Sequence, residues 1–108
     1  MKIFYVTLNT DDEARRIARA LLEQRAAVCC NWMPITCAYR FGEEIKEEPE
    51  TLLIVKTQDD MRAVVEPIVA AVAPYLNCVA EIAPSSVNSG FLEWLDRDAP
   101  PAWVRQAP

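Results

Sequence analysis

The chain has 108 residues, which is enough for one domain with its own core and too few for two. Hydrophobic residues make up 52% of it and charged residues 25%, an ordinary composition for a globular protein that needs no disulfide or metal to build a core. The formal net charge of −5 argues against partners such as nucleic acid or an anionic membrane, because both require a basic face.

The N-terminal apolar stretch, residues 3–6, is too short for a secretory signal or a membrane span. We therefore expect a cytoplasmic protein in which the 4 cysteines are reduced thiols and not a disulfide framework. The sequence contains no histidine, which removes the commonest general base and the commonest metal ligand. These features favour a binding or regulatory protein over an enzyme.

A buried strand followed by an amphipathic helix is expected first. Residues 2–8 are apolar, aromatic and β-branched, as in a buried strand. Thr10 is placed to cap the helix, with Glu13 reaching back to the Thr10 amide as in a capping box. Apolar side chains then recur at helical spacing as far as Leu22, while arginines and Glu23 occupy the other side.

Two long strands joined by a tight turn follow. Pro34 lies within the first, residues 27–41, and lacks the amide that a ladder bond needs, so this strand is expected at a sheet edge or broken by a bulge. The turn is expected at residues 41–44, and residues 51–57 have the continuous apolar character of a central strand. Such a hairpin can project beyond the sheet. Its acidic end, residues 41–50, is either a solvated surface, a set of ligands for a hard cation, or a contact for a partner protein.

The second helix is predicted by an apolar stripe over residues 61–72. Asp59 and Asp60 precede the stripe, where negative charge favours the positive end of the helix dipole. Pro67 is expected to kink the helix or to delay its start, and the helix must end before Pro74.

A fourth strand at residues 78–82 and a short helix, capped by Asn88 or Ser89 and running to Asp96, complete the pattern. The order strand–helix–strand–strand–helix–strand is that of an α+β, ferredoxin-like sandwich with an antiparallel sheet and an extra short C-terminal helix. The second and fourth strands of this fold lie at opposite edges of the sheet. The fold alone does not select a function.

The cysteines are expected to lie apart within one chain. Cys29 and Cys30 are strand neighbours, so one faces the core and the other faces away. Cys37 lies roughly 26 Å further along a regular strand, and Cys78 is expected at the opposite sheet edge. A cysteine-based metal site would therefore be assembled between subunits. The alternative is that each cysteine is a small buried hydrophobic residue.

Lys56 is the one charge in the apolar segment of the third strand. Its ammonium group either extends to solvent at the strand end, or binds an anion or a carboxylate such as that of Glu81. The chain has only 2 glycines, so it offers no glycine-rich cradle for phosphate.

Five short segments, in the expected order, resemble the CutA divalent-cation tolerance family over roughly residues 2–97. On this resemblance the domain spans residues 1–98, and residues 99–108, with Trp103, form a short tail of unassigned role. The resemblance also implies a tight trimer, similar to the PII signalling proteins, whose strands pair across subunits and cover the exposed edge. The matching segments are residues 10–14 and 16–21, Cys29 with Asn31 and Pro34, residues 39–41, residues 53–57, and residues 91–95.

The resemblance implies a non-catalytic protein of divalent-cation tolerance or response, with copper or another divalent cation held by the soft thiol of Cys29. Family members carry a histidine where this chain has Ala73, so two alternatives stay open. One is a PII-like sensor that binds a small ligand in clefts between subunits through Lys56, Tyr39 and Glu81. The other is a structural trimer without metal.

Overall fold

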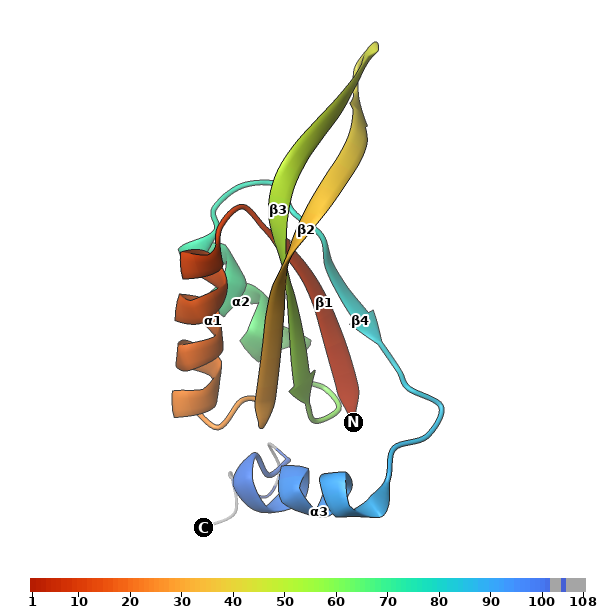
Figure 1. Ribbon diagram of the computed structural model, residues 1–108. Coiled ribbons are helices and arrows are strands. Elements are labelled where there is room, and N and C mark those ends of the chain that lie inside the picture. The colour runs from red at the N-terminus through yellow and green to blue at the C-terminus, as the bar shows by residue number, and fades with distance from the viewer. Residues whose placement is uncertain (102–103, 105–108) are drawn as a thin grey trace.

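The computed structural model describes residues 1–101 and 104, so the predicted tail residue Trp103 lies outside the described residues (Figure 1). The antiparallel sheet has the strand order β2-β3-β1-β4, which confirms the α+β, ferredoxin-like fold with β2 and β4 at the edges. The domain boundary at residue 98 stays a prediction. The elements are β1 (Lys2–Leu8), α1 (Asp11–Glu23), β2 (Cys29–Phe41), β3 (Glu44–Thr57), α2 (Arg62–Val72), β4 (Val79–Ile82) and α3 (Ser89–Asp98).

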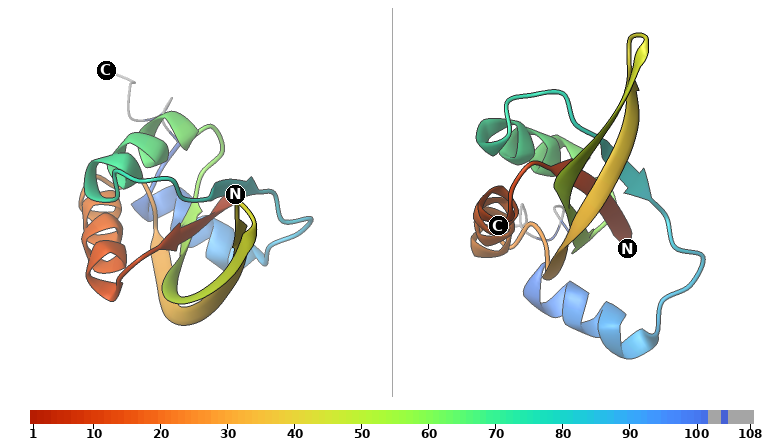
Figure 2. Two further views of the ribbon diagram at one scale, coloured as in Figure 1. Left: turned by 90° about the horizontal axis from the view of Figure 1, so that it is seen from above. Right: turned by 45° about the horizontal axis from the view of Figure 1, so that its top comes forward.

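The core lies between one face of the sheet and the two helices α1 and α2, which form a single layer beside it (Figure 2). Alternate residues of β1 and β3 face these helices, because successive strand side chains point to opposite sides. Each large apolar side chain buried here contributes roughly 1.5–3 kcal/mol. The fully buried side chains include Phe4, Val6, Ile17, Leu21, Leu53, Val55, Val65 and Val69.

The start of α1 has the capping box that the sequence predicts. The Thr10 hydroxyl accepts a hydrogen bond from the Glu13 amide at 3.1 Å, and the Glu13 carboxylate accepts one from the Thr10 amide at 3.0 Å. The Trp32 indole donates to Asp11 at 2.8 Å and so joins β2 to the same helix turn.

The β2–β3 hairpin runs in one register from the pair Cys29 and Lys56 to the pair Phe41 and Glu44. The predicted edge strand is therefore confirmed, and Pro34 causes no bulge because it lies in the edge strand, where its missing amide breaks no central ladder. Gly42 adopts φ +63 at the first turn position, a conformation that glycine takes without strain.

The far half of the hairpin stands clear of the sheet. β1 ends at Leu8, opposite Thr51, so beyond this point β2 and β3 pair only with each other. The strands cross as they leave the sheet, which is the effect of their right-handed twist (Figure 1). The predicted projection of the hairpin is confirmed.

The later elements differ from the predictions in some details. α2 begins at Arg62 and contains Pro67 in its interior, so Pro67 does not delay the start of the helix, and the kink stays a prediction. The two aspartates before it do not lie in its first turn: Asp59 pairs with the N-terminal amino group at 3.3 Å, and Asp60 has φ 58.

β4 begins at Val79, one position later than predicted, and leaves Cys78 just before the strand. α3 starts at the predicted place and continues to Asp98, although the side chain of Asn88 makes no capping hydrogen bond. The end of α2 at Val72, before Pro74, agrees with the prediction.

Candidate functional site

Cys29 and Lys56 meet at the end of the sheet that α3 covers. They are direct cross-strand partners, so their side chains share a face. The Lys56 ammonium lies 3.9 Å from the Cys29 sulfur and 5.7 Å from the ring centroid of Phe91 on α3. The positive charge of Lys56 is therefore matched by a thiol and an aromatic ring, and not by the carboxylate suggested from the sequence.

Glu81 lies on the opposite face of the sheet from Lys56. Its strand partner is Phe4, whose side chain is buried under the helices, whereas the partner of Lys56 on β1 is Ile3. The Glu81 carboxylate lies 3.8 Å from Arg62, and the Arg62 guanidinium lies 5.3 Å from the centroid of the Phe4 ring. Lys56 and Glu81 thus have separate partners within one chain.

Cys30 faces the core, opposite Val55, whereas the preceding residue Cys29 faces away from it, as the alternation of a strand predicts. Burial, with a smaller contribution from the neighbouring thiol of Cys29, raises the pKa of Cys30 to about 12. A thiol held neutral in this way is unsuited to binding metal or to nucleophilic attack.

Tyr39 lies at a different place, in a cavity of about 510 Å³ between the projecting hairpin and the segment before β4. Desolvation raises the pKa of Tyr39, and so do a hydrogen bond to Glu48 and the negative charge of that residue. We call this space the hairpin cavity. Its lining residues are Thr7, Asn9, Cys37, Tyr39, Arg40, Phe41, Glu48, Glu50, Leu76 and Cys78.

Two cysteines, Cys37 and Cys78, both line the hairpin cavity, and sequence reasoning missed this. Cys37 belongs to the hairpin, and Cys78 lies beside the far edge strand β4. The crossing of the two hairpin strands carries the outer part of β2 toward the β4 side of the molecule (Figure 1). The expectation that Cys37 and Cys78 lie far apart, at opposite edges of the sheet, assumed flat strands and therefore does not apply to this pair.

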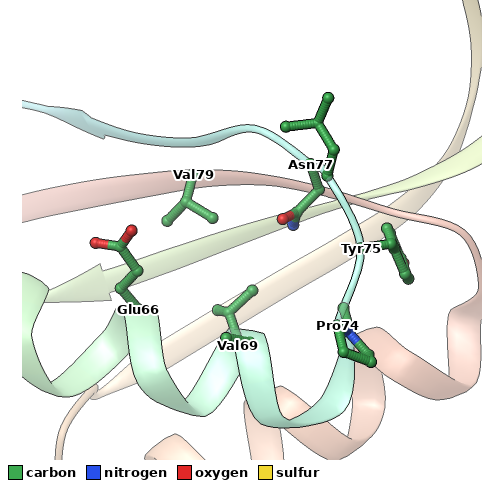
Figure 3. Close-up of a pocket in the computed structure, with 9 residues that line it drawn as sticks. Glu66, Val69, Pro74, Tyr75, Asn77 and Val79 are labelled. Atoms are coloured by element: carbon green, nitrogen blue, oxygen red, sulfur yellow. The ribbon is translucent and has the colours of Figure 1, made fainter.

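A second cavity, of about 550 Å³, lies at the C-terminal end of α2, where Glu66 and Val69 face Asn77 and Val79 across it (Figure 3). Ala73, the position at which the family resemblance implies a histidine, lines this cavity. The polar groups here already have partners within the chain: the Glu66 carboxylate pairs with Arg62 at 3.1 Å, and the Asn77 amide donates to the Thr7 carbonyl at 2.9 Å.

The described part of the chain contains no group of three or more cysteine, aspartate or glutamate side chains placed to hold one metal ion. Within those residues, Cys29 is not part of a complete metal site. None of the helices in residues 1–101 and 104 has the length and apolar character of a membrane span.

The face of the sheet that points away from α1 and α2 is apolar and has no helix layer over it (Figure 2). We call it the open face. Tyr5, Met33 and Ile82 lie on it and remain 36%, 42% and 45% exposed. Ile3, Leu52 and Ile54 complete its apolar surface.

These features define a ferredoxin-like α+β sandwich with a long projecting hairpin and an apolar open face. The chain belongs to the family of the CutA1 divalent ion tolerance protein, whose sequence model matches residues 2–98. It is 36% identical to Protein CutA of Homo sapiens over 103 residues, which are 94% of this chain. The chain spans about half (53%) of the length of that human protein.

Bacterial and archaeal relatives match over nearly their whole length. The divalent-cation tolerance protein CutA of Thermus thermophilus is 35% identical over 106 residues, which are 97% of this chain and 95% of that protein. The structure of the Archaeoglobus fulgidus CutA, described as a periplasmic divalent cation tolerance protein, superposes with a TM-score of 0.85 at 33% identity. That match covers 92% of this chain and 99% of the other.

Proposed function

We propose that this chain is a non-catalytic, homotrimeric protein of divalent-cation tolerance that acts in the cytoplasm, with copper as its cation and Cys29 as a soft ligand. The family and the names of the relatives from Homo sapiens and Thermus thermophilus support cation tolerance in general. The apolar open face carries the proposal of an assembly, and the absence of histidine from the sequence argues against the commonest acid–base chemistry.

The open face supports assembly because an antiparallel sheet face exposed to water normally carries polar side chains. Here Ile3, Tyr5 and Ile54 form a contiguous apolar row across two paired strands. The edge strand β2 adds unpaired backbone groups beside that row, and an edge of this length is a liability unless another chain covers it. Copies of the same chain would cover both the apolar open face and the unpaired backbone groups of β2.

Cys29 supports copper binding through the softness of its thiolate, which suits copper better than a carboxylate does. Its side chain lies on the same side of the sheet as the open face, where a second chain would approach. The ammonium group of Lys56, 3.9 Å from the sulfur, repels a cation, so carboxylates of a neighbouring subunit must supply the remaining ligands and offset that charge.

A second candidate is a PII-like sensor that binds a small ligand. The hairpin cavity favours it, because a volume of about 510 Å³ lies in the size range of small-molecule sites and Tyr39 is on its wall. Lys56 and Glu81 would join Tyr39 only if different subunits contributed them, since they lie on opposite faces of one chain.

Native mass spectrometry of the reduced protein, with and without Cu(I) or Cu(II), tests the assembly and the metal together. We expect a trimer that binds about one copper ion per subunit and loses it in Cys29→Ala. Cys30→Ala is the matched control and should keep the metal, because that neighbouring thiol faces the core.

Each other outcome has a definite meaning. A trimer that stays free of copper would overturn the copper proposal and favour the sensor or a structural trimer. A monomer at all accessible concentrations would overturn the assembly on which every one of these functions depends.

A further inference from the structure

The cavity at the C-terminal end of α2 has no part in the functions proposed above. We call it the α2 cavity. Its volume of about 550 Å³ lies in the size range of small-molecule sites. Val69, Ala70 and Val79 supply apolar wall, and two polar side chains, Glu66 and Asn77, face each other across the space (Figure 3). This combination of an apolar wall and a few polar groups is typical of a site for a small organic molecule.

The α2 cavity lies on the helix side of the sheet. Its wall residue Val79 pairs with Val6 of β1, which is fully buried beneath the helices, and Val79 packs against the same core. The strand beside the cavity, β4, is the edge of the sheet opposite to β2. The open face and the β2 edge, which copies of the chain are proposed to cover, therefore lie on the other side of the sheet or at its other edge.

Hydrogen bonds within the chain fix the wall formed by the segment after α2. The Tyr75 hydroxyl donates to the Glu13 carboxylate at 2.8 Å, and the Tyr75 amide donates to the Ala73 carbonyl at 2.9 Å. Further along, the Asn77 side chain donates to the Thr7 carbonyl at 2.9 Å. The cavity is thus formed before a ligand arrives, which reduces the entropy that binding would cost.

The charges around the α2 cavity favour a positive group. The helix α2 ends at Val72, and the next two residues, Ala73 and Pro74, line the cavity, so the negative end of the helix dipole lies beside it. The last turn of α2, residues 69–72, carries no basic side chain to offset this end. Glu66 adds a carboxylate. Its Oε2 atom accepts a hydrogen bond from Arg62 at 3.1 Å, and a carboxylate has room for further donors.

Asn77 supplies a second acceptor. Its Nδ2 atom donates to the Thr7 carbonyl, so the amide oxygen is the atom that can accept from a ligand. Arg62 does not need to leave Glu66 for this, because its guanidinium is also held by the Val79 carbonyl at 3.0 Å and lies 5.3 Å from the centroid of the Phe4 ring. A ligand cation would share the Glu66 carboxylate with Arg62.

We propose that the α2 cavity binds a small organic amine. The apolar body of the amine packs against Val69, Ala70 and Val79, and its protonated amino group donates to the carboxylate of Glu66 and to the amide oxygen of Asn77. This site is separate from the copper site and from the assembly proposed above, so it stands or falls independently of them.

Other classes of ligand fit the α2 cavity less well. A hard divalent cation takes about six or more oxygen ligands, whereas Glu66 and Asn77 offer two groups and Ala73 offers none. Residues 1–101 and 104 place no third carboxylate or thiol with them. An anion would meet both the Glu66 carboxylate and the negative end of the helix dipole, in a chain whose net charge is −5.

An NMR titration of the whole isotope-labelled protein with 2-phenylethylamine tests the proposal. We expect a saturable change of chemical shift at the amides of Val69, Ala70 and Ala73, with a Kd on the order of 1 mM or tighter. Two other probes carry the same ring without the positive charge. The neutral 2-phenylethanol should bind several-fold more weakly, and the anionic 3-phenylpropionate should not bind detectably.

Two variants with matched controls locate the site. Glu66→Gln should weaken binding of the amine several-fold, as expected for a pair of charges partly open to solvent. Glu23→Gln is its control, since Glu23 forms the same kind of helical ion pair, with Arg19, outside the cavity. Ala70→Phe should fill the cavity and abolish binding, whereas Ala71→Phe, at an exposed position of the same helix that does not line the cavity, should not.

The opposite results are equally clear. Equal affinity for the amine, the alcohol and the carboxylate would overturn the assignment of an amine. Binding of the amine that Glu66→Gln and Ala70→Phe leave unchanged would place the ligand elsewhere and overturn the site, as would the absence of any saturable shift change.

Discussion

Cys29 and Cys30 are consecutive residues, yet the alternation of β2 gives their thiols different surroundings. Cys30 packs against the core opposite Val55, and burial raises its pKa to about 12. Cys29 lies beside the Lys56 ammonium and the helix α3. Of these two thiols, only that of Cys29 lies on the side of the sheet where a ligand or a second chain can approach.

The raised pKa of Cys30 predicts a loss of stability in alkaline solution. An unfolded cysteine titrates near pH 9.0, so above this pH the unfolded chain releases a proton that the native chain retains. The free energy of unfolding should fall as the pH rises from 9.0 toward about 12. Cys30→Ala should flatten this fall, as measured by urea unfolding at a series of alkaline pH values.

Cys78→Ala provides the control, because that thiol is exposed. Its pH profile should follow the parent protein. Equal slopes for the parent and Cys30→Ala would contradict the assigned burial of the Cys30 thiol.

At the scale of elements, one carboxylate ties the start of α1 to the segment after α2. Glu13 accepts hydrogen bonds from the Asn9 amide and the Thr10 amide, both at 3.0 Å, and from the Tyr75 hydroxyl at 2.8 Å. The Thr10 hydroxyl completes the cap by accepting from the Glu13 amide. The cap thus fixes the position of a neighbouring segment as well as the helix end.

Thr10→Ala should lower the free energy of unfolding by about 1 kcal/mol, because the Glu13 amide loses its acceptor at the start of the helix. Thr10→Ser keeps a hydroxyl at the same position and should retain most of the stability. Chemical denaturation of the three proteins measures both values. A loss in Thr10→Ser equal to that in Thr10→Ala would show that the hydroxyl does not act as a cap.

At the scale of the whole molecule, the helices protect one face of the sheet and leave the other face apolar. If copies of the chain cover the open face, a charge placed on it should separate them, because a buried unpaired carboxylate is strongly unfavourable. Tyr5→Glu should convert the trimer into a folded monomer, measured by sedimentation equilibrium and circular dichroism.

Val64→Glu is the matched control for that charge. Val64 lies on α2, in the helix layer, and is 36% exposed, the same as Tyr5. The Val64→Glu protein should remain a trimer. Dissociation of both variants, or of neither, would contradict assembly through the open face.

The sequence predicts most of the fold because its signals are local. The structure confirms the helix cap predicted from Thr10 and Glu13. It also confirms the edge strand predicted from Pro34 and the end of α2 before Pro74, since a proline restricts the backbone at its own position. The sites depend on longer-range geometry. That Cys37 and Cys78 line one cavity follows from the twist of the long hairpin, and no short segment of the sequence predicts it.

The site residues show the same limit. Whether Lys56 and Glu81 share a face depends on the registers of β3 and β4 against β1, and these are set by the packing of whole strands. Of the alternatives for Lys56, pairing with Glu81 is therefore excluded within one chain, because the sheet separates the two side chains.

β3 is one unbroken strand with two very different environments. Residues 51–57 pair with strands on both sides, and their alternate side chains lie beneath the helices, whereas residues 44–50 pair with β2 alone. The amides of the outer part can open and exchange their hydrogens with solvent while the sheet stays intact, but those of the inner part exchange only when the domain unfolds. A single ladder thus joins well-protected and poorly protected backbone, and in an isolated chain the outer hairpin can fluctuate without any loss of the fold.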